Sequence, residues 1–133
     1  MKKTFQIKAK LLYNKRVKKD YLHCVLEAPK IARCAFPGQF VNIKITDSLE
    51  PLLRRPFSIH RVSGARIEIP YEVLGKGTEI LSQKKAGEYL DVIGPLGNGF
   101  DYRRQIREDR RQVLVAGGMG VADGRLARTT RPA

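Results

Sequence analysis

Apolar and polar residues alternate over much of the first hundred positions, in short runs separated by glycine and proline. In residues 5–10, for example, every second side chain is apolar and the others are glutamine or lysine. A period of two is that of a β-strand with one buried face. The pattern predicts six short strands, at residues 5–12, 21–27, 39–46, 56–61, 66–73 and 89–93.

One helix is predicted between the last two of these strands. Thr78 is a suitable N-cap, Glu79 suits the positive helix start, and Gly87 supplies a stop. Ile80 and Leu81 give the helix an apolar side. The expected fold is therefore mostly β. It is a six-stranded antiparallel Greek-key barrel with one capping helix, which pairs the strand edges and covers the open end.

The composition changes after residue 100. Residues 101–112 are largely charged and read as a linker. Residues 113–122 begin with an apolar run followed by glycines, as in the first strand of a parallel α/β nucleotide-binding domain. Residues 123–133 show neither helical nor strand periodicity. We expect a barrel domain at 1–100, a linker, the start of a second domain and a tail.

The net charge of +13 raises the possibility of a nucleic-acid-binding barrel. Eight basic residues lie in the first twenty positions. Where they alternate with apolar residues, however, they are typical of the solvated face of a strand. Most aromatic residues fall on inward positions instead of forming an exposed row among the lysines. Nucleic acid is therefore kept only as an alternative partner.

The sequence predicts neither a membrane segment nor a metal site. Its apolar runs are too short to span a bilayer, and no apolar stretch follows Lys2 and Lys3, so we expect a cytoplasmic protein. Cys24 and Cys34 do not have the spacing of zinc or iron–sulfur ligands. We expect two reduced thiols.

Two short motifs carry the candidate chemistry. Arg55-Pro56-Phe57-Ser58 offers a fixed cation, a rigid bend, a ring and a hydroxyl. Gly75-Lys76-Gly77-Thr78 offers backbone N–H groups at a helix start, which suit a pyrophosphate. Together they predict a flavin dinucleotide site. Taken singly, the arginine could be a surface residue beside Arg54, the phenylalanine a core ring and the glycines a turn.

Five motifs in this order resemble the ferredoxin reductase superfamily, and most closely the electron-transfer subunit of type B dihydroorotate dehydrogenase. The resemblance covers about residues 4–122. Its strongest pieces are Pro37-Gly38-Gln39-Phe40-Val41, Arg54-Arg55-Pro56-Phe57-Ser58-Ile59, Gly75-Lys76-Gly77-Thr78-Glu79, Gly94-Pro95-Leu96-Gly97-Asn98-Gly99-Phe100 and Gly117-Gly118-Met119-Gly120-Val121-Ala122.

The resemblance implies an electron relay in pyrimidine biosynthesis. In that family the barrel binds FAD, a following α/β domain binds NADH, and a C-terminal cysteine cluster holds a [2Fe–2S] centre. Electrons pass from NADH through these centres to the FMN of a catalytic subunit that oxidises dihydroorotate, within a heterotetramer. A related NADPH:ferredoxin oxidoreductase or sulfide dehydrogenase subunit is the alternative within the superfamily.

The resemblance also assigns nine residues to the FAD site. Arg55 matches the arginine that faces the pyrophosphate, where a bidentate guanidinium suits paired oxygens. Gly77 and Thr78 match the phosphate-binding helix start. The residues matched to the isoalloxazine and to a second flavin-contacting strand are Pro56, Phe57, Ser58, Pro70, Tyr71 and Glu72. Residues 94–97 would form a wall near the domain junction.

The chain departs from the family pattern near its end. Asp123-Gly124-Arg125 stands where the family has a proline and an apolar helix, and the cysteine cluster is missing. We therefore expect only the FAD barrel and the first strand of the NAD domain. Such a chain would bind FAD weakly and could not complete the relay by itself.

Overall fold

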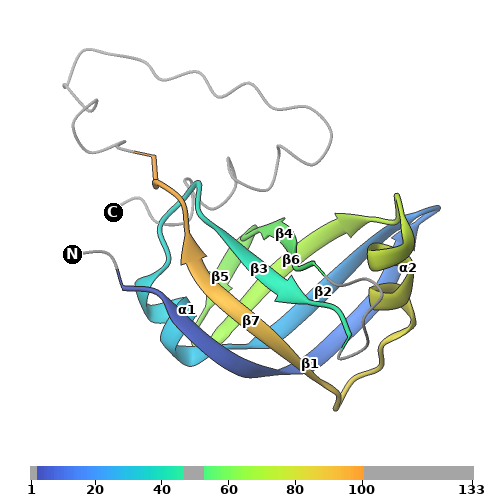
Figure 1. Cartoon of the computed structure of the whole chain (residues 1–133), viewed down its shortest axis with the longest axis horizontal. Helices are drawn as coiled ribbons and strands as arrows, with labels where there is room; N and C mark the ends of the chain where they lie inside the picture. The colour runs from blue at the N-terminus through green and yellow to red at the C-terminus, as the bar shows by residue number, and fades with distance from the viewer. Residues whose placement is uncertain (1–2, 47–52, 101–133) are drawn as a thin grey trace.

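The computed structural model describes residues 3–46 and 53–100. The predicted linker, second-domain strand and tail lie outside this part of the chain. The described residues form seven strands and two helices (Figure 1): β1 (Phe5–Lys18), β2 (Tyr21–Glu27), α1 (Pro29–Cys34), β3 (Phe40–Lys44), β4 (Arg55–Ser58), β5 (Arg61–Ser63), β6 (Arg66–Glu72), α2 (Lys76–Gln83) and β7 (Tyr89–Leu96). Neither helix is long and apolar enough to cross a membrane.

All seven strands belong to one antiparallel sheet in the order β4-β3-β7-β1-β2-β6-β5. The predicted mostly β, antiparallel architecture is confirmed. The prediction of six strands was one too low because residues 56–61 contribute to two strands. The Ile59 N–H donates to the Gln39 carbonyl beside β3 at 3.3 Å, and the next N–H, of His60, donates to Glu68 on β6 at 2.9 Å. Consecutive residues thus bond to opposite edges of the sheet, which curls it.

The first strand is longer than its hydrophobic pattern predicts. Alternation ends near residue 12, but β1 continues to Lys18 and pairs with β2 across a two-residue turn. Lys19 adopts a left-handed φ of 45° in that turn. The extension is exposed and basic, so no buried face marks it in the sequence. The Val73 N–H donates to the Asp20 carbonyl at 2.8 Å, which places the hairpin tip beside the residues that lead into α2.

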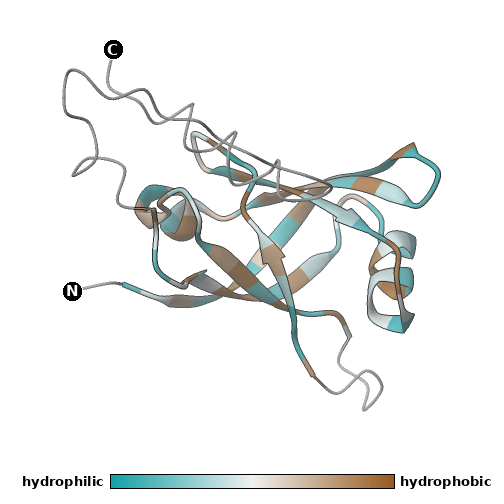
Figure 2. Ribbon diagram, turned by 90° about the horizontal axis from the view of Figure 1, so that it is seen from above, coloured by the Kyte–Doolittle hydropathy of each residue, from teal (hydrophilic) through white to brown (hydrophobic). Residues whose placement is uncertain are grey.

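The inner faces of the curled sheet form the hydrophobic core. Along the strands, hydrophobic and hydrophilic residues alternate as the period of two requires (Figure 2). The largest fully buried side chains are Leu11, Leu26, Ile31, Val41, Ile43, Ile45, Ile59, Ile67, Ile69, Leu81 and Leu90. Burying one such side chain stabilises the fold by about 1.5–3 kcal/mol.

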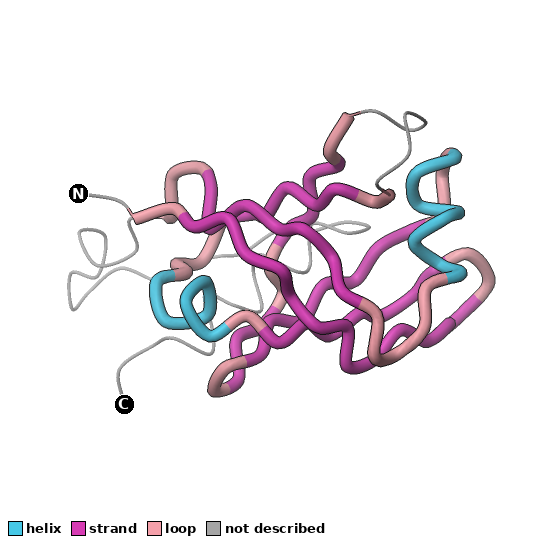
Figure 3. The backbone as a smooth tube through the Cα atoms, turned by 60° about the horizontal axis from the view of Figure 1, so that its bottom comes forward, coloured by secondary structure: helices cyan, strands magenta, loops and turns pink. Residues whose placement is uncertain are grey.

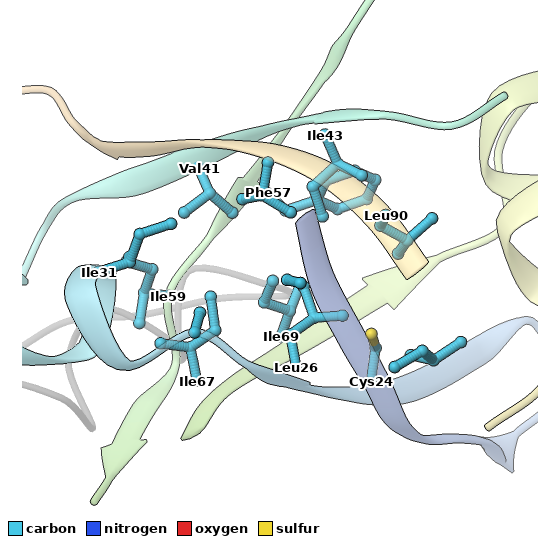
Figure 4. Packing of buried hydrophobic residues seen from close by; sticks show 14 of the residues in the cluster. Cys24, Leu26, Ile31, Val41, Ile43, Phe57, Ile59, Ile67, Ile69 and Leu90 are labelled. Atoms are coloured by element: carbon cyan, nitrogen blue, oxygen red, sulfur yellow. The ribbon is translucent and has the colours of Figure 1, made fainter. Parts of the chain in front are cut away.

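The two helices lie at opposite ends of the barrel (Figures 1 and 3). Helix α1 begins at Pro29 and buries Ile31 and Ala32. In Figure 4, Ile31 lies with Val41, Ile59 and Ile67 in one apolar group. This helix was not predicted, because six residues are too few to show a helical period and its only sequence signal is a proline suited to a first turn.

The end of β7 is held against the turn that precedes β3. The Phe100 N–H donates to the Pro37 carbonyl at 2.7 Å, and the Gln39 side-chain amide donates to the Gly97 carbonyl at 3.0 Å. A Cβ on Gly38 would lie 3.1 Å from the ring of Phe100, and Gly38 has a φ of +91°. Glycine is therefore required at this position for both space and backbone conformation.

Candidate functional site

The two motifs that predict the site meet in the structure at the start of α2. Arg55 is the first residue of β4, and its side chain lies against Gly77 in the first turn of the helix. A Cβ built on Gly77 would lie 3.1 Å from Arg55 Nε and 3.3 Å from its Cγ. The Arg55 guanidinium also donates to the Leu53 carbonyl at 3.1 Å. A fixed cation thus stands beside the positive end of a helix dipole, an arrangement that suits an anion.

The helix begins earlier than the sequence analysis predicts. Gly75 is the N-cap, with an extended backbone, and the Glu79 N–H donates to its carbonyl at 2.9 Å. Thr78 is therefore the third helical residue and not the N-cap. Its hydroxyl oxygen accepts from the N–H groups of Leu74 and Gly75, at 3.0 and 3.2 Å. The hydroxyl is thus engaged within the turn, and the backbone N–H groups of the first turn remain the natural donors to an anion.

Arg54 and Arg55 do not form the surface pair that sequence alone allows. Arg54 Nη2 donates to Asp91 Oδ1 on β7 at 2.7 Å, and Arg54 Nη1 donates to the Asp91 carbonyl at 3.1 Å. The Gln6 side-chain amide lies 3.3 Å from both oxygens of the same carboxylate. Burial of Asp91 acts to raise its pKa, but the hydrogen bonds from Arg54 and Gln6 outweigh this and lower the pKa below its usual value.

The two aromatic residues assigned to the flavin lie in the core. Phe57 and Tyr71 are only 7% and 3% exposed, and their rings meet edge to face with centroids 5.9 Å apart. The Tyr71 hydroxyl donates to Asn14 Oδ1 at 2.7 Å. Burial, with a smaller contribution from Cys24, raises the pKa of Tyr71, so its hydroxyl stays protonated and donates at neutral pH. Both rings support the surface of the site from within.

The remaining predicted residues occupy alternate positions on the same two strands. Pro56 is exposed and Ser58 half-buried on β4, while Pro70 and Glu72 are half-buried on β6. Strands β4 and β6 are in contact although no ladder joins them. Because successive side chains of a strand point to opposite faces, Pro56 and Ser58 point away from Phe57 on β4, and Pro70 and Glu72 point away from Tyr71 on β6. A planar ring bound here would therefore meet polar and proline side chains.

Asn14 is a residue of this end that sequence analysis missed. Its side-chain amide donates to the carbonyls of Leu81 and Lys84, at 2.8 and 2.9 Å, and its oxygen accepts from Tyr71. It thereby ties the C-terminal end of α2 to β1, and its bond to Leu81 adds to the one that this carbonyl accepts from the Lys84 N–H. No motif marks this asparagine. The only signal is a polar residue in a strand whose alternation has just broken.

Sequence comparison finds relatives among electron-transfer subunits. A dihydroorotate dehydrogenase B (NAD(+)) electron transfer subunit of Desulforamulus reducens is 41% identical over 124 residues, which are 92% of this chain and 45% of the relative. The one of Bacillus velezensis is 46% identical over 99 residues, 73% of this chain and 38% of the relative. The chain thus spans less than half the length of these relatives. No protein-family model matches it.

Solved structures agree on the fold. An NADH-dependent reduced ferredoxin-NADP oxidoreductase matches with a TM-score of 0.64 and 28% identity, over 70% of this chain and 34% of its own. The ferredoxin reductase of a carbazole 1,9a-dioxygenase matches with a TM-score of 0.75 and 20% identity, over 93% of this chain and 38% of its own. The resemblance stated from the sequence motifs, and the ferredoxin reductase-like barrel expected from it, are both confirmed.

Proposed function

Given that this chain is homologous to the electron-transfer subunits of dihydroorotate dehydrogenase B, we propose that its barrel is the FAD-binding part of such a subunit. The observation that carries the proposal is the contact between Arg55 and Gly77 at the start of α2. Two motifs separated by about twenty positions would each supply half of a pyrophosphate site, and their residues Arg55 and Gly77 lie side by side.

The proposal implies an orientation for FAD on the described residues. Arg55 and the N–H groups around Gly77 and Thr78 would hold the pyrophosphate, because a guanidinium and a helix start both favour paired anionic oxygens. The face formed by Pro56, Ser58, Pro70 and Glu72 would receive the isoalloxazine, with Phe57 and Tyr71 packed beneath it. Bound FAD would supply a ring that accepts a hydride and releases electrons singly.

The wider activity is proposed from the relatives. In the complete subunit, NADH would reduce the flavin, and a [2Fe–2S] centre would carry the electrons to the FMN of a dihydroorotate dehydrogenase catalytic subunit. The expected NAD-domain start lies outside the described residues, and we assign no residue of this chain to the cluster. We propose that the barrel supplies only part of the contacts to FAD, and that contacts from a second domain would raise the affinity.

Titration of the purified chain with FAD and with riboflavin, followed by flavin fluorescence, tests this proposal. FAD should bind at least about tenfold more tightly, because riboflavin lacks the pyrophosphate that Arg55 would contact. Arg55→Ala should remove most of that preference and leave riboflavin binding unchanged. A matched control is Arg61→Ala, since Arg61 is a half-exposed arginine that lies 3.9 Å from Glu68 on the other edge of the sheet.

Two results would contradict the proposal. One is equal affinity for FAD and riboflavin in the unaltered chain. The other is a loss of FAD binding in Arg61→Ala as large as the loss in Arg55→Ala, because general loss of positive charge would then explain both. Binding of single-stranded DNA without any binding of FAD would favour the nucleic-acid alternative.

A further inference from the structure

Arg54 and Arg55 are neighbours in the sequence, but their side chains have separate surroundings. Arg55 lies on Gly77 of α2, where the pyrophosphate is proposed to bind. Arg54 instead makes two hydrogen bonds to Asp91, one to the carboxylate and one to the backbone carbonyl. Its side chain is 24% exposed and that of Asp91 is 17% exposed, so the pair is largely shielded from solvent. Only one of the two cations is thus directed at the proposed site.

The contact between Arg54 and Asp91 spans the edge of the sheet. In the strand register, Arg55 of β4 faces Ile43 of β3, and Lys44 of β3 faces Asp91 of β7. Arg54 therefore reaches across β3 to bond with β7. Gln6 of β1 approaches the same carboxylate from the far side. We call Arg54, Asp91 and Gln6 the edge clamp, because it links the start of β4 to β7 and β1 across the intervening strand β3.

The edge clamp acts where β4 is least constrained. In the strand order, β4 is the outermost strand and has a ladder to β3 alone. Pro56, the second residue of β4, is a proline, a residue that sheets accept mainly on edge strands. Backbone pairing therefore restrains the start of β4 from one side only, and the side-chain contacts of Arg54 add a second restraint. The residue immediately after this restraint is Arg55.

We propose that Arg54 is a positioning residue, which orients Arg55 toward the start of α2 through the edge clamp. The inference rests on the proposed function, because it concerns how the FAD pyrophosphate is held. Fixing the backbone at residue 54 fixes the Cα of residue 55 and so limits the directions that the Arg55 side chain can take.

Asp91 also affects the charge near the proposed site. It occupies the Arg54 guanidinium, which would otherwise be a competing cation one residue from the site.

A double-mutant cycle separates positioning from general stabilisation. FAD affinity is measured for the unaltered chain, Arg54→Ala, Arg55→Ala and the double variant, with riboflavin as the ligand without pyrophosphate. Arg54→Ala should weaken FAD binding by about fivefold when Arg55 is present and by less than about twofold when it is absent. Riboflavin affinity should be the same in all four proteins. A residue that merely stabilised the barrel would lower both affinities in both backgrounds.

Milder variants keep the test decisive if Arg54→Ala does not fold. Arg54→Lys retains the charge but lacks the planar guanidinium that donates to both Asp91 Oδ1 and the Asp91 backbone carbonyl. Asp91→Asn retains the shape of the side chain but loses its negative charge. Both should show the same dependence on Arg55, with smaller losses of FAD affinity. Arg61→Ala again serves as the control. Arg61 lies on β5, the opposite edge strand, and is close to the carboxylate of Glu68 on β6.

Different results would contradict the positioning role of Arg54 and the proposed FAD site. If the unaltered chain binds FAD no better than riboflavin, the proposed function is wrong. If it prefers FAD, but the Arg54 and Asp91 variants lose the same affinity with and without Arg55, then the edge clamp only stabilises the sheet. That result would overturn the positioning role and leave the FAD site in place.

Discussion

The two ends of the barrel are covered by helices of very different character. Helix α1 closes its end with apolar side chains, of which Ile31 is fully buried. Helix α2 buries Gly77 and Leu81, presents a glycine-rich start, and is tied to β1 by Asn14. One end is thus held by packing and the other largely by directed hydrogen bonds. Under the proposed function, stability and ligand binding would be divided between opposite ends of one small fold.

The largest effect is expected from Ile31→Ala at the α1 end. This substitution removes a fully buried side chain and leaves a cavity, so the free energy of unfolding should fall by about 2–5 kcal/mol. Urea denaturation followed by far-UV circular dichroism measures the loss. FAD affinity, measured where the variant is still folded, should stay within about twofold of the original. A large loss of affinity in the folded variant would show that the ends are not independent.

Asn14→Ala should have the next largest effect, and it acts at the α2 end. The change removes the Asn14 amide from the Tyr71 hydroxyl and from the Leu81 and Lys84 carbonyls, of which Leu81 keeps the Lys84 N–H. This should cost about 1–3 kcal/mol in the free energy of unfolding. Hydrogen exchange should show faster opening of α2, with little change in α1. Asn42→Ala is the control, because Asn42 is a half-buried asparagine in the middle of β3, where its register partners are on β4 and β7. Equal acceleration at α1 would contradict the division between the two ends.

Gly77→Ala tests the chemistry of the α2 end with little change in stability. The new Cβ would lie 3.1 Å from Arg55 Nε, so the arginine must move, and FAD affinity should fall by about tenfold. The free energy of unfolding should change by less than about 1 kcal/mol, because alanine favours a helix more than glycine does. In Gly75→Ala the Cβ meets nothing within 4 Å, so this variant is the steric control. A similar loss of affinity in both variants would show that displacement of Arg55 is not the cause.

The smallest effect concerns the pH dependence of the edge clamp. The pKa of Asp91 is lower in the folded protein than in the unfolded chain. Its contribution to stability is therefore complete above the unfolded pKa of about 3.9 and is lost as the pH falls through the lower folded value. Asp91→Asn should cost about 1 kcal/mol at neutral pH, with the deficit shrinking in acid. Urea titrations at pH 7 and pH 3 measure it, and a deficit that grew in acid would contradict the sign.

Much of the fold could be predicted because apolar and polar residues alternate along a strand that has one buried face. All six predicted strands overlap strands of the structure, and the glycine motif does begin a helix. Errors arose where local signals are short or ambiguous. Helix α1 has only six residues, and the hydroxyl of Thr78 looks like an N-cap although Gly75 holds that position. In the latter case the threonine side chain bonds back to the residue that precedes the helix.

The amino-acid sequence by itself determined the alternating strands, the order of the motifs and the residue types available to bind a pyrophosphate. Only the tertiary structure decided that Ile59 and His60 bond to opposite sheet edges and that Arg54 and Arg55 face different partners. The physical reason is distance along the chain. A strand period depends on residues two positions apart, whereas the contacts of Arg54 with Asp91 and of Arg55 with Gly77 join residues far apart in sequence, which meet only when the sheet curls.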